Sequence, residues 1–550
     1  MDGHVQYPPE VSAEYRKKGY WIDKTISEVL DESFDQFASN QVLMAVQSER
    51  VYTYKELGDL STRVALHLNA SGVKLYDRIV LQAPNHPEML IAYLGILKAG
   101  AIPIMALPPH QEAEIGYFAK HADAVGLVIP SVFGKTDKQQ MAVNVMKEAP
   151  SLKWALVTEG EPQNGFYAIR DFLADPIETR VDAGILPRPD PDAPAVLQLS
   201  GGTTGIPKLI PRTHNDYVYN FLCNADVCKL GTDSVMLLAI PQAHNFALAC
   251  PGFMGLASKG GCQLLSSVPS PEAAMEAIQK HRVTHWLAVP AMIITLLNHP
   301  KRHQYDLSSL KVILTGGSKL NAEVITRIGP ELGCGVQQVL GMAEGPLFWT
   351  RLDDPEVVRV ETQGRPQSPG EEFKIVEPGT EREVEPGELG ELWCRGPHTI
   401  RGYYRAAEHN ANAFSADGFY KSGDLVWLHP SGNVVVEGRI KDCINRGGEK
   451  ISAEEIENHI LANSKVNNCA CVSMPDPVLG ERVCAFVVLK PDQTLTLEEL
   501  SDFLLNVRRI AKFKIPERLE IVEAMPLTNV GKLNKVELRK MAAEKVVNEK

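Results

Sequence analysis

Hydrophobic residues in the first part of the chain follow two alternating periodicities. Residues 54–70 place apolar side chains every three or four positions, whereas 42–47 and 78–83 are short, almost continuous apolar runs. The first spacing predicts an amphipathic helix and the second predicts strands. The helical pattern runs into Gly72, a residue type that is common just after a helix end. The alternation returns between 270 and 340, so the pattern predicts helices layered on parallel sheets.

The most apolar segment of the chain is residues 90–109. Lys98, Gly100, Pro103 and a Pro108–Pro109 pair interrupt it. A membrane-spanning helix needs about 20 continuous apolar residues. The segment therefore predicts a buried helix followed by a strand.

The pattern changes after about residue 365, where short strand-like runs alternate with Pro/Gly turns and predict a β-rich subdomain. Beyond about 440, a helix at 453–463 and two apolar strands predict a separate small α+β domain, and the polar tail 540–550 is expected to fray. The predicted fold class is α/β. Its predicted parts are an N-terminal domain (1–438) of layered α/β subdomains plus the β-rich subdomain, a connection (439–443) and a C-terminal domain (444–550).

The composition narrows the class of protein. The net charge is −12, from 56 Lys and Arg against 68 Asp and Glu, and no basic stripe is present, so neither nucleic acid nor a membrane is an expected partner. The N-terminus lacks a basic stretch followed by an apolar one, so we expect no secretory signal and a cytoplasmic location. The ten cysteines form no CxxC pair and are expected to be reduced thiols.

Residues 200–208 (SGGTTGIPK) combine glycines, hydroxyl side chains and a lysine directly after a predicted strand. The glycines allow a sharp turn that presents backbone N–H groups to an anion, and the hydroxyls and the lysine add further donors. The loop is not a Walker A motif, and a plain surface turn is the alternative interpretation. The candidate phosphate ligands are Ser200, Gly201, Gly202, Thr203, Thr204 and Lys208.

This loop resembles the core motif of the adenylate-forming superfamily, which includes acyl-CoA synthetases, luciferases and the adenylation domains of nonribosomal peptide synthesis. Further segments resemble the other motifs of that superfamily, in its order: 340–345 (LGMAEG), 420–424 (YKSGD), 438–442 (GRIKD), 445–450 (NRGGEK) and 526–532 (PLTNVGK). The resemblance implies an enzyme that uses ATP and Mg²⁺. In its reaction a carboxylate attacks the α-phosphate of ATP and expels pyrophosphate, so catalysis rests on positioning and charge neutralisation.

The resemblance also assigns roles to individual residues. Lys532 would reach the reacting carboxylate and the α-phosphate, Glu344 would hold Mg²⁺, and His244 is a third catalytic candidate beside the acid. Asp424 would accept hydrogen bonds from the ribose, supported by Arg439. The adenine would lie against Gly316 and Gly317, between Thr315 and Ser318, and against Gly341, Met342 and Ala343.

The resemblance further implies a mobile C-terminal domain. Asp442 would be the hinge about which this domain swivels between adenylation and thiol attack. The swivel would withdraw Lys532 and bring in a loop that lines the pantetheine tunnel. The residues expected in that loop are Arg446, Gly447 and Gly448.

Residues 241–252 (PQAHNFALACPG) resemble the aryl-acid branch, whose stand-alone ligases load salicylate or 2,3-dihydroxybenzoate in siderophore biosynthesis. The implied acid pocket comprises His244, Asn245, Phe246, Cys250, Gly317 and Leu347. Asn245 could bond a ring 2-hydroxyl. Cys250 and Leu347 resemble the salicylate ligases, because the dihydroxybenzoate ligases tend to have serine and valine at these positions. The physical chemistry agrees, since a thiol is a poor hydrogen-bonding partner and leucine fills the space that a 3-hydroxyl needs. Ordinary core packing is the alternative interpretation of those two residues.

The expected acyl acceptor is the phosphopantetheine thiol of a separate aryl carrier protein, because the chain has no attachment motif of its own. A 2,3-dihydroxybenzoate-AMP ligase and an aryl-CoA ligase using free CoA are the nearest alternatives. A nucleotide-binding homologue without turnover is a further one, against which Lys532, Glu344 and Asp424 argue. A GxSxG hydrolase and a GxGxxG dehydrogenase are not supported by the motifs.

Overall fold

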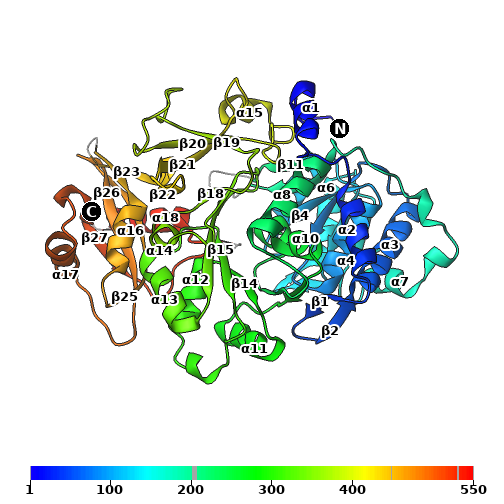
Figure 1. Ribbon diagram of the computed structural model, residues 1–550, viewed down its shortest axis with the longest axis horizontal. Helices are drawn as coiled ribbons and strands as arrows, with labels where there is room; N and C mark the ends of the chain where they lie inside the picture. Colours follow the sequence, from blue (N-terminus) through cyan, green and yellow to red (C-terminus); the bar gives the residue numbers. More distant parts are fainter. Residues whose placement is uncertain (1, 201–206, 447–448, 529–531, 549–550) are drawn as a thin grey trace.

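The computed structural model describes residues 2–200, 207–446, 449–528 and 532–548. Two large sheets with helices between and around them form most of the N-terminal part, a small antiparallel sheet lies beside them, and a further sheet with its own helices forms the C-terminal end (Figure 1). The predicted α/β fold class is confirmed.

The first large sheet is parallel in its interior and antiparallel at its edges. Its strands, in spatial order, are β18 (Arg365–Pro366), β17 (Leu347–Trp349), β16 (Gly335–Gly341), β15 (Val312–Gly316), β14 (His285–Ala288), β12 (Val235–Leu238), β13 (Cys262–Leu265), β1 (Gln41–Ala45) and β2 (Arg50–Thr53). The nearly continuous apolar strands are those of a sheet covered on both faces.

The second large sheet is parallel except for its edge strand β11, which pairs with β10 in the antiparallel sense. Its strands, in spatial order, are β11 (Leu209–Thr213), β10 (Pro194–Leu199), β4 (Ile102–Ala106), β3 (Arg78–Gln82), β5 (Gly126–Ile129), β8 (Trp154–Val157) and β9 (Tyr167–Ala168). The segment that joins β10 to β11 is the predicted phosphate loop.

The main apolar core lies between the two large sheets and draws side chains from both. The helices that fill it are α2 (Ile26–Gln36), α3 (Tyr54–Ala70), α4 (Pro87–Lys98), α8 (His214–Val227), α9 (Asn245–Ala249) and α10 (Gly252–Ala257). The outer faces of the sheets are covered by α11 (Pro271–His281), α12 (Pro290–Leu297) and α13 (Ala322–Leu332) on one side and by α5 (Glu112–His121) and α6 (Lys138–Glu148) on the other.

Two local predictions are confirmed in this core. Helix α3 begins at a capping box between Thr53 and Glu56 and is followed by Gly72 in the left-handed conformation. The apolar segment forms the buried helix α4 and then β4. In the ranges that the structure describes, no helix combines the length and apolar content needed to cross a bilayer.

The β-rich subdomain is an antiparallel sheet of β19 (Glu372–Val376), β20 (Gly390–Arg395), β21 (Tyr420–Leu428) and β22 (Val434–Arg439). A short 3₁₀ turn (Ile440–Asp442) leads from it into the C-terminal sheet. That sheet contains β23 (Cys443–Arg446), β24 (Glu449–Ser452), β25 (Val466–Asp476), β26 (Gly480–Leu489) and β27 (Arg518–Ile521).

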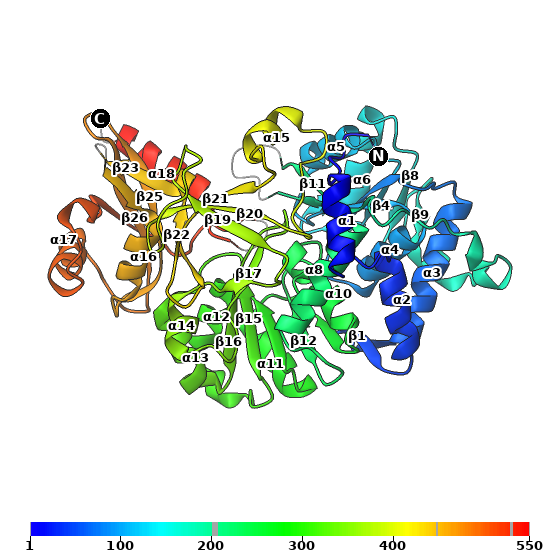
Figure 2. The same cartoon turned by 45° about the horizontal axis from the view of Figure 1, so that its top comes forward.

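Helices cover both faces of the C-terminal sheet (Figure 2). Helix α16 (Ala453–Leu461) packs on one face, where Cys469 and Cys471 are both buried, and α18 (Lys535–Asn548) packs on the other. Helix α17 (Leu497–Asp502) joins the α16 side. All ten cysteines are free thiols.

The prediction that the C-terminal tail frays is wrong up to Asn548. Residues 540–548 continue helix α18, whose Leu538 and Ala542 are fully buried against β25 and β26. The tail has too few apolar residues to indicate a core helix, but one narrow stripe is enough when a sheet face is available to receive it.

Candidate nucleotide and acid site

The site lies at the carboxyl ends of the parallel strands β15 and β16, where open α/β sheets bind ligands. Strand β15 ends at Gly316, where an added Cβ would meet the Val339 side chain at 2.4 Å. Gly317 follows with a φ of +88°, which favours glycine. Glycine therefore suits both positions, because at 316 it leaves room for the Val339 side chain and at 317 it allows the left-handed backbone.

Lys532 reaches this strand end from the C-terminal domain. A Cβ built on Gly317 would lie 3.0 Å from Lys532 Cε and 3.7 Å from Nζ. The lysine is held in a tight turn, in which the backbone N–H of Thr528 donates to the Lys532 carbonyl (2.6 Å) and the Lys532 N–H donates to Thr528 Oγ1 (3.2 Å). Gly317 and Lys532, which are far apart in the sequence, are therefore neighbours in the fold.

The charges around Lys532 oppose one another. Burial is the main cause that lowers the pKa of Lys532 to about 8; the positive charge of Arg439 acts in the same direction, and the negative charges of Asp424 and Glu344 oppose it. All three groups belong to the predicted nucleotide site. At neutral pH the ammonium remains mainly protonated and is available to neutralise a phosphate or carboxylate.

His244 is the N-cap of α9 and lies near Lys532, whose positive charge acts on the imidazole. Burial, and secondarily the Lys532 charge, lower the His244 pKa to about 3, so the imidazole is neutral. Its Nδ1 accepts the backbone N–H of Phe246 at 3.2 Å. The proton of the neutral ring is therefore on Nε2, which makes that atom a hydrogen-bond donor.

Glu344 is buried in the loop that follows β16. The hydroxyl of Tyr403 lies 2.6 Å from Glu344 Oε1 and donates to it, and the Tyr420 hydroxyl lies 3.2 Å from that of Tyr403. The next residue, Gly345, has a φ of +128°, and a Cβ there would lie 1.8 Å from the His398 carbonyl oxygen. The loop therefore requires glycine at that position. Tyr403 was not predicted, because nothing in its own sequence neighbourhood indicates a contact with Glu344.

A single carboxylate would suit the magnesium ion that the motif resemblance implies. Mg²⁺ is commonly bound by one or two carboxylates together with phosphate oxygens and water. In the described parts of the chain, no group of three or more His, Cys, Asp or Glu side chains could enclose a metal. Glu344 fits an ion whose remaining ligands come from the nucleotide.

Asp424 and Arg439 lie opposite one another on β21 and β22 and form an ion pair at 2.7 Å. Asp424 is almost fully buried, and its second oxygen, Oδ2, has no hydrogen-bond partner. A buried carboxylate oxygen without a donor is costly unless a ligand supplies one. A ribose hydroxyl would satisfy it. Thr315 Oγ1, at the end of β15, is also buried without a partner.

The predicted acid-pocket residues share one part of the main core. Phe246, Cys250 and Leu347 are buried there together with Val289 and Val339. Leu347 lies over Gly341, where an added Cβ would meet its side chain at 2.3 Å. Asn245 is buried beside them and donates from Nδ2 to Cys250 Sγ at 3.2 Å.

Two hydrogen bonds join Ser200 and Lys208, the residues at either end of the predicted phosphate loop. The Ser200 N–H donates to the Lys208 carbonyl at 3.0 Å, and the Lys208 N–H donates to Ser200 Oγ at 2.9 Å. Gly201, Gly202, Thr203 and Thr204 lie outside the described residues. Met342 and Ala343 are partly buried in the loop after Gly341, where the Ala343 carbonyl accepts from Arg212 at 3.0 Å.

The predicted hinge and tunnel residues pair within the C-terminal domain. Asp442 pairs with Arg539 of α18, and Arg446 pairs with Glu517 at 2.5 Å. Arg446 is therefore not brought to the Gly317 end of the sheet in this arrangement. Gly447 and Gly448 lie outside the described residues.

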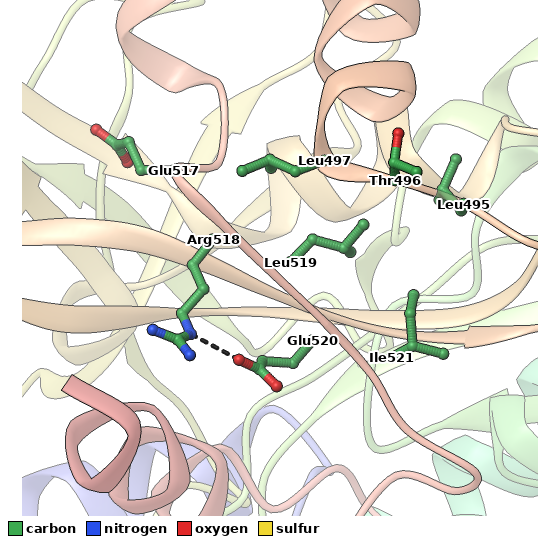
Figure 3. A pocket seen from close by; sticks show the side chains of 8 residues that line it. All are labelled: Leu495, Thr496, Leu497, Glu517, Arg518, Leu519, Glu520 and Ile521. Atoms are coloured by element: carbon green, nitrogen blue, oxygen red, sulfur yellow. Dashed lines mark hydrogen bonds and ion pairs between the residues drawn. The ribbon is translucent and has the colours of Figure 1, made fainter. Parts of the chain in front are cut away.

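A surface hollow on the C-terminal domain contains none of the predicted site residues (Figure 3). It lies between β27 and the start of α17, and apolar side chains such as Leu497 and Leu519 line it. Its guanidinium, on Arg518, pairs with Glu520 at 2.6 Å. The candidate site is instead the place where Lys532 meets the carboxyl end of β15 at Gly317.

Comparisons with known proteins identify the family of this chain. Residues 30–404 match the AMP-binding enzyme family, and residues 455–532 match the AMP-binding enzyme C-terminal domain. Among the most similar relatives, the chain is 41% identical to the 2,3-dihydroxybenzoate-AMP ligase of Bacillus subtilis (strain 168), covering 100% of this chain and 99% of that protein. It is 42% identical to a salicylyl-CoA synthase / salicylate adenylyltransferase of a Streptomyces species (98% and 97% covered). It is 40% identical to the salicyl-AMP ligase / salicyl-S-ArCP synthetase of Mycobacterium tuberculosis (97% and 94% covered). The chain belongs to the AMP-binding enzymes of the adenylate-forming superfamily.

Proposed function

We propose that this AMP-forming ligase activates an aryl carboxylic acid with ATP, releases pyrophosphate, and passes the aryl group to the phosphopantetheine thiol of a separate carrier protein in siderophore biosynthesis. The observation that carries the proposal is the approach of Lys532 to Gly317. It joins the predicted nucleotide groups, Asp424 and Glu344, to the predicted acid pocket at His244.

Each charged group has a defined task in the proposed reaction. Asp424 binds the ribose through its unpaired Oδ2, while its Oδ1 pairs with Arg439. Glu344 holds Mg²⁺, which supplies charge neutralisation at the phosphates when bound. The Lys532 ammonium bridges the carboxylate of the acid and the α-phosphate, which reduces the repulsion between two anions. His244 offers its Nε2 proton to the acid carboxylate.

The aryl-acid proposal rests on the pocket and on the relatives. The predicted pocket residues Phe246 and Leu347 are buried apolar side chains, and the similar proteins are named for 2,3-dihydroxybenzoate and salicylate. We propose salicylate as the substrate. Cys250 Sγ already accepts from Asn245 (3.2 Å) and Asn220 (3.5 Å), and a thiol has little further capacity for a 3-hydroxyl.

The test of substrate is ATP–pyrophosphate exchange with salicylate, 2,3-dihydroxybenzoate and benzoate. We expect kcat/KM for salicylate to exceed that for 2,3-dihydroxybenzoate about ten- to a hundredfold, the cost of burying an unpaired hydroxyl. The double variant Cys250→Ser, Leu347→Val should narrow this ratio by restoring a hydroxyl partner and space. A wild-type preference for 2,3-dihydroxybenzoate would reject the pocket argument, and no exchange with any aryl acid would reject the aryl proposal.

The acceptor is tested by adding a thiol to the preformed aryl-adenylate. Relatives are named both for a CoA product and for a carrier-protein product. We expect faster transfer to a phosphopantetheinylated aryl carrier protein than to free CoA. Equal or faster transfer to CoA would make the chain an aryl-CoA ligase.

The adenylation rate should fall as pH rises through about 8. The pKa of Lys532 is lowered to about 8 in the folded enzyme, and only the protonated form carries the charge that the reaction needs. Activity is therefore full below this pH and lost above it. Lys532→Arg supplies the control, because a guanidinium stays protonated. This variant should be slower than wild type, but its adenylation rate should not fall near pH 8. If the rate still falls there, the titrating group is not Lys532.

A further inference from the structure

A chain of buried hydrogen bonds lies behind the acid pocket. Gln198 Nε2 donates to the Tyr217 hydroxyl at 3.2 Å, and the Tyr217 hydroxyl donates to Asn245 Oδ1 at 2.6 Å. Tyr217 is completely buried, and Gln198 and Asn245 are nearly so. The chain connects the strand before the phosphate loop to the residue expected to contact the ring of the acid.

The bond lengths set the direction of this chain. A separation of 2.6 Å is typical of O–H···O and shorter than N–H···O bonds usually are, so the oxygen of the Asn245 amide faces Tyr217. Burial raises the pKa of Tyr217 far above its ordinary value, so the phenol remains a donor. The Asn245 amide nitrogen then faces the other way, toward Cys250 Sγ at 3.2 Å.

The ring of Tyr217 packs against the buried Arg212 guanidinium. The Arg212 guanidinium lies over its ring at 4.6 Å, and Arg212 also pairs with Asp216 at 2.8 Å and donates to the Ala343 carbonyl at 3.0 Å. Arg212, Asp216 and Tyr217 are all fully buried, next to the GMAEG loop that Arg212 contacts. The ring of Tyr217 therefore has little freedom to rotate or retreat.

The fixed amide matches the chemistry of a 2-hydroxy aryl acid. The 2-hydroxyl of such an acid donates to its own neighbouring carboxylate, which leaves its oxygen as an acceptor. Asn245 uses one N–H on Cys250 and has a second N–H available. A flipped amide would present a carbonyl oxygen to an acceptor and would repel it.

We propose that Tyr217 is a positioning residue that fixes the amide orientation of Asn245 and thereby selects aryl acids with a 2-hydroxyl over acids without one. The proposal rests on the proposed aryl-acid adenylation. It extends the acid site to a residue that does not touch the substrate.

The test compares ATP–pyrophosphate exchange of salicylate and benzoate in wild type and Tyr217→Phe. Loss of one hydrogen bond should lower the ratio of kcat/KM for salicylate over benzoate about three- to tenfold, with benzoate itself nearly unchanged. Tyr93→Phe is the matched control, because Tyr93 is equally buried and its hydroxyl contacts only Met254 Sδ at 3.6 Å among the bonds of the described residues. That variant should keep the wild-type ratio.

The outcomes separate this proposal from the proposed function. Wild type that exchanges with no aryl acid would reject the function itself. An active Tyr217→Phe enzyme that loses salicylate and benzoate turnover equally, or loses neither, would overturn the positioning role. If Tyr217→Phe does not fold, Gln198→Met removes the donor that orients the phenol, and the same selective loss is required of it.

Discussion

Replacing Lys532 with alanine is expected to lower kcat/KM for ATP–pyrophosphate exchange about a hundred- to a thousandfold. The variant removes the positive charge that reaches the Gly317 strand end, where two anions must come together. Loss of one preorganised group that stabilises developing charge costs about this much in other enzymes. The measurement is pyrophosphate exchange at saturating ATP with the preferred acid.

Transfer from a preformed aryl-adenylate to the thiol provides the control for Lys532→Ala. If the C-terminal domain swivels about Asp442 after adenylation, the lysine leaves the site, so this second step should change by no more than severalfold. Lys540→Ala, on the exposed side of α18, should leave both steps at the wild-type rate. Equal loss of both steps in Lys532→Ala would show a structural rather than an adenylation role.

Arg212→Met is expected to lower the free energy of unfolding by about 3–5 kcal/mol. The Arg212 and Asp216 side chains are 0% and 1% exposed and lie 2.8 Å apart, so the variant leaves a buried carboxylate without its counter-ion. It also removes the donor from the Ala343 and His398 carbonyls. Urea denaturation gives the change directly.

Arg188→Met is the matched control, because the Arg188–Glu28 pair, at 2.6 Å, is even shorter than the buried pair, but its side chains are 55% and 38% exposed. Surface pairs contribute about 0–1 kcal/mol. Adding Asp216→Asn to Arg212→Met should recover part of the loss by removing the unpaired charge. A cost for Arg212→Met no larger than that of Arg188→Met would contradict the buried-pair argument.

The periodicity of the sequence predicted most helices and strands around the site. It succeeded at α3, α4 and β4, because a long amphipathic or fully apolar pattern has one stable arrangement against a core. It missed the length of α18, because the helix is stabilised by Leu538 and Ala542 on a sheet formed by distant strands. A local pattern does not show which surfaces will be available for packing.

The sequence by itself determined the chemical inventory of this protein: a glycine- and hydroxyl-rich loop, the carboxylates Glu344 and Asp424, and Lys532 in motifs of one superfamily. Motifs reveal these residues because local turn geometry and chemistry constrain each of them. Only the tertiary structure decided that Lys532 meets Gly317 and that Tyr403 donates to Glu344. It also decided that the Tyr217 hydroxyl donates to Asn245 Oδ1. These contacts join segments that are far apart in the chain. They depend on how the whole core packs and satisfies its hydrogen bonds, which no local pattern shows.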